Sequence, residues 1–180
     1  MERRSDQGSI RRLIYAAFFM ALGLVLPFLT GQIPEIGKLL SPMHIPILLC
    51  GFVCGWRYGG VVGFITPLLR SVLFGIPVLY PNAIGMAFEL MTYGIVAGAL
   101  YSMCRKKDIL RVYLCLIVAM FTGRLVWGVA SLILYGVAGN SFTWSMFITG
   151  AFLGAIPGII LHLIIIPPIV LSVERYRRRS

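Results

Sequence analysis

Six apolar segments, separated by breaks rich in charged residues, glycine or proline, occupy nearly all of the 180-residue chain. A helix of about 17 to 25 apolar residues crosses the hydrocarbon core of a bilayer. The first, fourth, fifth and sixth segments reach that length, whereas the second and third share one apolar run interrupted only by Trp56-Arg57-Tyr58. The pattern predicts an all-α integral membrane protein, a single membrane domain with six transmembrane helices at about 13–29, 44–56, 58–75, 82–104, 109–137 and 145–173. An alternative is that residues 44–75 form a hairpin that does not fully cross.

Basic residues are distributed unevenly between the two sides of these segments. An excess of Lys and Arg marks the cytoplasmic side of a membrane protein. If the amino terminus is inside, the outer loops hold only Lys38, so both termini are predicted to be cytoplasmic and the number of spans even. The inner side then holds thirteen of the sixteen Lys and Arg residues: Arg3, Arg4, Arg11, Arg12, Arg57, Arg105, Lys106, Lys107, Arg111, Arg175, Arg177, Arg178 and Arg179.

The composition agrees, because 59% of the residues are hydrophobic and 12% are charged. A net charge of +10 would suggest nucleic-acid binding in a soluble chain. Here the cations lie in short clusters beside the spans, where anionic lipid and topology account for them. We predict a multi-pass protein of the cell membrane, in contact with the lipid bilayer, that does not bind nucleic acid.

Four cysteines are present, and none is accompanied by His or Asp at metal-ligand spacing. Cys50 and Cys54 are one helical turn apart, so a metal or redox pair is geometrically possible. Small apolar packing residues are the simpler interpretation, and we expect no metal site and no cofactor.

Small residues four positions apart recur on four spans, and such faces let helix backbones approach closely in lipid. Most of them are expected to serve packing within the protein, but six helices do not need all four. The face on the first span could therefore either pack internally or contact a partner. The pairs are Ala17 with Ala21, Gly51 with Gly55, Gly94 with Gly98, and Gly150 with Gly154.

Three charged residues lie inside predicted spans, where a charge is costly and generally faces a cavity or a partner. At 1.5 Å per residue, Arg70 and Arg124 are each about 20 Å from the inner end of their spans. Glu89 is about 10 Å from the outer end of its own, so all three are expected in one layer of the outer half. They could form a buried ion pair, or they could line a pocket open to the outside in which one arginine is left for an anionic ligand.

Residues suited to a small polar ligand surround this layer. An aromatic floor with a few convergent polar groups is typical of small-molecule sites. His162 is expected to be a packed helix histidine on the inner side of the layer. The candidate substrate-binding residues are His44, Arg70, Asn82, Glu89, Tyr93, Arg124, Trp127 and Asn140.

The whole chain resembles the substrate-binding S components of energy-coupling factor (ECF) vitamin transporters. The resemblance rests on the length, six spans, the Ala17-x-x-x-Ala21 face, a long first outer loop and two local patterns. These are Ser41-Pro42-Met43-His44-Ile45-Pro46 followed by Leu48-Leu49-Cys50-Gly51, and Tyr80-Pro81-Asn82-Ala83.

This resemblance implies a binding subunit that captures a vitamin or precursor near the outer face. It implies contact of Ala17 and Ala21 with a transmembrane T component, and energy from two cytoplasmic ATPases. It also implies that the substrate is bound by His44, Asn82, Glu89, Arg124, Trp127 and Asn140. The third span contributes less consistently in this family, so Arg70 is a weaker candidate. The chain lacks Gly-x-x-x-x-Gly-Lys-Ser/Thr, so the ATPase must be supplied by partners.

Other functional classes fit the residues less well. No nucleophile and base, aspartate pair or metal cluster is placed for an intramembrane enzyme. A stand-alone secondary carrier or channel is an alternative, although such carriers are generally built from two similar halves and none are evident here. Two arginines against one glutamate favour an anionic vitamin such as pantothenate, with folate also carrying carboxylates. A neutral vitamin such as pyridoxine stays open if Glu89 neutralises one arginine.

Overall fold

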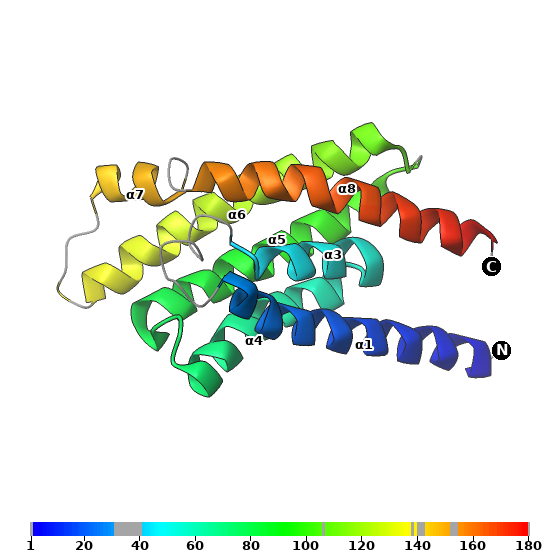
Figure 1. The fold of residues 1–180 in the computed structure, drawn as a ribbon, viewed down its shortest axis with the longest axis horizontal. Coiled ribbons are helices and arrows are strands. Elements are labelled where there is room, and N and C mark those ends of the chain that lie inside the picture. Colours follow the sequence, from blue (N-terminus) through cyan, green and yellow to red (C-terminus); the bar gives the residue numbers. More distant parts are fainter. Residues whose placement is uncertain are drawn as a thin grey trace.

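The computed structural model describes residues 2–30, 41–105, 107–137, 139, 143–151 and 155–179, and within this part the chain is helical without a strand. The long elements cross one another in a bundle (Figure 1). In chain order the elements are α1 (Glu2–Val25), η1 (Leu26–Thr30), α3 (His44–Cys54), α4 (Trp56–Phe74), η2 (Leu79–Ala83), α5 (Ile84–Met103), α6 (Ile109–Val137), α7 (Trp144–Ala151) and α8 (Ile156–Arg179).

Four helical stretches are long and apolar enough to cross a membrane: Ser9–Phe28, Leu79–Met103, Ile109–Val137 and Ile156–Tyr176. They correspond to the first, fourth, fifth and sixth predicted spans. The all-α prediction is therefore confirmed for the described residues. The topology with six crossings stays a prediction.

Two predicted boundaries differ from the structure. The turn between the second and third segments is at Gly55, whose φ of 95° suits glycine, rather than at 56–58. It leaves α3 with 11 residues, about 16 Å of helix and roughly half a bilayer core. The last segment was expected as one span from 145, but α7 ends at Ala151 and α8 begins at Ile156. Hydropathy missed these two helix ends because the sequence on both sides of them is apolar.

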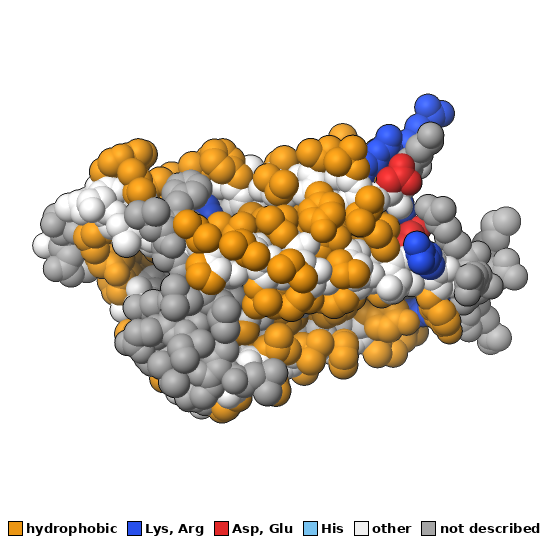
Figure 2. Space-filling view, turned by 45° about the horizontal axis from the view of Figure 1, so that its top comes forward, with side chains coloured by type: hydrophobic (Ala, Val, Ile, Leu, Met, Phe, Trp, Pro, Cys, Tyr) orange, Lys and Arg blue, Asp and Glu red, His pale blue; other side chains and the backbone are white. Residues whose placement is uncertain are grey.

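The two ends of the described chain lie together, since α1 begins and α8 ends at the same end of the molecule (Figure 1). In the face shown by Figure 2, hydrophobic side chains cover the length of the bundle and most visible charges gather at that end. One ion pair there joins Lys107 Nζ to Glu174 Oε2 at 3.1 Å. This distribution matches the basic side inferred from the sequence.

Glycines allow α5 to lie directly against the α3–α4 hairpin. A Cβ added to Gly94 would lie 2.2 Å from the backbone carbonyl carbon of Gly59, and one added to Gly51 would lie 2.7 Å from the Gly94 carbonyl oxygen. Gly98 similarly abuts Gly51 and Trp56. The Gly94–Gly98 face is thus internal packing, and it holds α5 at the centre of the fold.

We expect Gly94→Ala to destabilise the protein, because the new methyl group would meet backbone that cannot rotate away. Overpacking of this kind costs about 1 to 3 kcal/mol, measurable as a lower melting temperature in detergent. Gly136→Ala is the matched control: it is also helical, has no atom within 4 Å of an added Cβ, and should be neutral or slightly stabilising. Equal effects of the two substitutions would contradict the close crossing.

The α1 helix packs on the rest of the protein by one edge only. Ala16 and Phe19 are buried, whereas the neighbouring Ala17 and Ala21 are exposed together with Phe18. The Ala17–Ala21 face therefore points away from the other described helices and is available to lipid or to another protein.

Candidate substrate-binding site

A buried carboxylate on α5 lies at the centre of a polar cluster. Glu89 is 2% exposed. Its Oε1 atom is 3.0 Å from Nη1 of Arg124 on α6 and accepts a hydrogen bond from the Tyr93 hydroxyl at 2.7 Å. Two of the three charged residues predicted in one layer thus form an ion pair, and Tyr93 joins them from one helical turn along α5.

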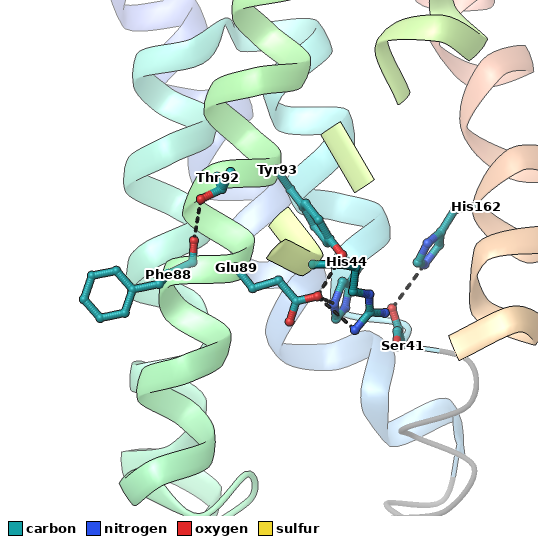
Figure 3. A network of polar contacts seen from close by, with 8 residues as sticks. Ser41, His44, Phe88, Glu89, Thr92, Tyr93 and His162 are labelled. Carbon is teal, nitrogen blue, oxygen red and sulfur yellow. Dashed lines mark hydrogen bonds and ion pairs between the residues drawn. The ribbon is translucent and has the colours of Figure 1, made fainter. Parts of the chain in front are cut away.

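Two histidines complete the cluster from α3 and α8 (Figure 3). His44, the first residue of α3, has Nε2 3.6 Å from Glu89 Oε1. Its ring lies 5.4 Å from the ring of Tyr93 and stacks on His162 at 5.8 Å. His162 Nε2 is in turn 3.4 Å from the Ser41 carbonyl oxygen. The cluster therefore joins α3, α5, α6 and α8 at one depth.

The local sequence explains how these side chains meet. Glu89 and Tyr93 are four residues apart and so share one face of α5. Gly123 immediately precedes Arg124, and a Cβ there would lie 2.1 Å from Tyr93 Cε1. Only the absence of a side chain at this position lets the tyrosine ring reach α6 and lets Arg124 approach Glu89.

The charges of the cluster cancel, but its hydrogen bonds are incomplete. One carboxylate faces one guanidinium, and Tyr93 adds a neutral donor. Within the described part of the chain, Arg124 Nε and His44 Nδ1 are buried without a hydrogen-bond partner, whereas His44 Nε2 is within ion-pair distance of Glu89 Oε1. Buried polar atoms usually have a partner, so Arg124 Nε and His44 Nδ1 are the atoms a polar ligand could satisfy.

Arg70 is not part of this cluster. It is buried on α4, where Nη1 donates a hydrogen bond of 2.5 Å to the Leu24 carbonyl at the end of α1. Its guanidinium also lies over the rings of Phe28 and Phe74, at 5.1 and 5.4 Å. The expected layer shared by Arg70 and Glu89 stays a prediction, and the contacts of Arg70 are with α1, η1 and its own helix rather than with Glu89.

The remaining candidates lie around the cluster or outside the described residues. Asn82 is exposed in η2 and forms no hydrogen bond with a described residue. Trp127 stacks on Phe147 of α7, with ring centres 6.5 Å apart. Asn140 lies outside the described residues.

His162 was expected on the inner side of the layer, and the structure places it in the layer itself. The error came from counting its depth from residue 145. Counted from the start of α8 at Ile156, His162 is six residues in, or about 9 Å. Hydropathy gives no sign of this boundary, but Gly154 before the helix and Pro157 in its first turn are the sequence signal that could have corrected the count.

No three His, Cys, Asp or Glu side chains converge as metal ligands among the described residues. The arrangement is suited instead to noncovalent recognition of a ligand, because a guanidinium, an imidazole and an aromatic ring lie close together among apolar residues.

A family described as "ECF transporter, substrate-specific component" matches residues 11–170. The chain belongs to this family. The match includes every described residue of the candidate site. No curated protein and no solved structure matches the chain.

As an ECF substrate-specific component, the protein is a substrate-binding subunit of a membrane transporter and not an enzyme. Membership implies a small-molecule substrate and association with a T component and ATPases. The four apolar helices agree with a membrane location.

Proposed function

We propose that this substrate-specific component takes up a small, water-soluble vitamin or vitamin precursor, and that the Glu89 cluster is where the molecule binds. The observation that carries the proposal is the group of buried, unpartnered polar atoms on Arg124 and His44, beside a carboxylate that is already neutralised. Such atoms are costly to leave without partners in an apolar interior. A ligand with both hydrogen-bond donors and acceptors would satisfy them.

The geometry favours a neutral or zwitterionic substrate, such as a pyridoxine-like heterocycle, over the anionic pantothenate that the charge count favoured. That count assumed that Arg70 and Arg124 share one Glu89. Arg70 instead donates a hydrogen bond to a backbone carbonyl of α1 and lies over two phenylalanine rings. The guanidinium of Arg124 is therefore the one that faces the Glu89 carboxylate. An anion added to this cluster would bring an uncompensated negative charge into a buried site.

Delivery across the membrane would depend on partners. We propose a multi-pass subunit of the cell membrane that associates with a T component and two cytoplasmic ATPases. The bound subunit would topple in the bilayer so that the site faces the cytoplasm. The face shown in Figure 2 is apolar along its length and presents little that would oppose such a rotation in lipid.

A melting-temperature screen of the purified protein tests the substrate class. We expect a neutral heterocyclic vitamin to raise the melting temperature, because a ligand at a hundred times its Kd stabilises the folded state by about 2.7 kcal/mol. Pantothenate and folate are the charged comparators and should give little shift. Stabilisation by pantothenate alone would overturn the neutral-substrate proposal, and no shift with any vitamin in folded, ligand-free protein would favour the carrier or channel alternative.

A further inference from the structure

A groove between α6 and α8, separate from the Glu89 cluster, has the form of a site for one lipid molecule. It has a volume of about 470 Å³. Its residues on α6 are Ile109 and Tyr113, one helical turn apart, and its residues on α8 recur on a single face. Those on α8 are Ile164, Pro168, Leu171, Ser172 and Arg175.

The dimensions of the groove match one leaflet. From Ile164 to Arg175 the α8 face covers eleven residues, or about 16 Å. Half of a bilayer core is about 15 Å. An acyl chain lying along Ile164 and Leu171 would therefore end at mid-membrane when its headgroup is level with Arg175.

The polar end of the groove is cationic and unpaired. Arg175 is exposed and Tyr113 is half-buried, and neither side chain forms a hydrogen bond or ion pair with a described residue. The nearest acid in sequence, Glu174, is engaged by Lys107 at 3.1 Å. A guanidinium and a phenol at the membrane surface complement a phosphate, and the residues that line the groove include no acid.

We propose that this groove binds an anionic phospholipid of the leaflet at the basic end of the molecule. The acyl chain lies against the aliphatic residues of α6 and α8, and Arg175 and Tyr113 donate hydrogen bonds to the headgroup phosphate. Basic pockets between membrane helices on the cytoplasmic side bind acidic headgroups in this way. The site is independent of the proposed vitamin site, from which it differs in helix face and in chemistry.

Lipid binding can be measured by native mass spectrometry of delipidated protein titrated with phosphatidylglycerol or phosphatidylcholine. We expect tighter binding of phosphatidylglycerol, and about fivefold weaker binding of that lipid by Arg175→Gln, the effect of about one cation near an anionic surface. Arg105→Gln removes an exposed charge at the same end but outside the groove, and should leave the affinity unchanged.

Two further arms separate the headgroup from the groove. Ile164→Trp fills the groove and keeps Arg175, so it should weaken binding of both lipids. Inorganic phosphate alone should not compete at millimolar concentration, because it lacks the acyl chain. Equal losses in Arg175→Gln and Arg105→Gln, unchanged binding in Ile164→Trp, or competition by free phosphate would overturn the proposal.

Discussion

Arg124→Gln is expected to abolish substrate binding and to destabilise the protein strongly. It removes the only Lys or Arg within ion-pair distance of Glu89 among the described residues and leaves the buried carboxylate with His44 as its one remaining basic neighbour. Breaking one partner of a buried pair costs about 3 to 5 kcal/mol. The melting temperature in detergent reports the stability, and isothermal titration with the vitamin identified in the screen reports the binding.

The double variant Glu89→Gln with Arg124→Gln separates the two effects. Because it removes both charges, it should recover more than half of the stability lost in the single variant. Substrate binding should stay lost, since the guanidinium is still missing. Wild-type affinity in the well-folded double variant would show that the vitamin binds elsewhere, while a stable Arg124→Gln single variant would show that the ion pair contributes little.

The paired substitution Ala17→Trp with Ala21→Trp is expected to abolish uptake while leaving substrate binding intact. Both alanines are exposed on α1, so two indole rings would cover that face without entering the core. If a T component docks there, the rings would prevent the backbones from approaching. Uptake into cells that coexpress the T component and the ATPases, and binding to the isolated subunit, are the two measurements.

Leu114→Trp with Val118→Trp is the matched control for bulk on the surface. These residues are also exposed and four positions apart, but lie on α6, and the pair should retain uptake. Loss of uptake in both pairs would indicate a general effect of bulky residues on movement in the membrane. Loss of substrate binding in the α1 variant would mean that this face supports the fold, and uptake by the subunit alone would favour a stand-alone carrier.

The apolar helices and the depth of residues within them could be predicted from the sequence, because both depend on counting residues along a helix. Four long apolar helices, a basic end and the common depth of Glu89 and Arg124 follow from hydropathy and a fixed rise per residue. The same counting failed for His162, because its helix begins at Ile156 and not at residue 145. Hydropathy does not mark that boundary, although Gly154 and Pro157 beside it are typical of the start of a helix.

The rotation of each helix about its axis was decided by tertiary packing. Arg70 and Arg124 are expected at similar depths from their sequence positions, but one contacts α1 and the other contacts Glu89. Those directions depend on where neighbouring backbones can approach, as at Gly94 against Gly59 and at Gly123 against Tyr93. The sequence by itself therefore determined the membrane class, the basic end and the residues able to carry charge within the bundle. Only the tertiary structure decided which of them meet, because a contact between helices depends on side-chain volume at positions far apart in the chain.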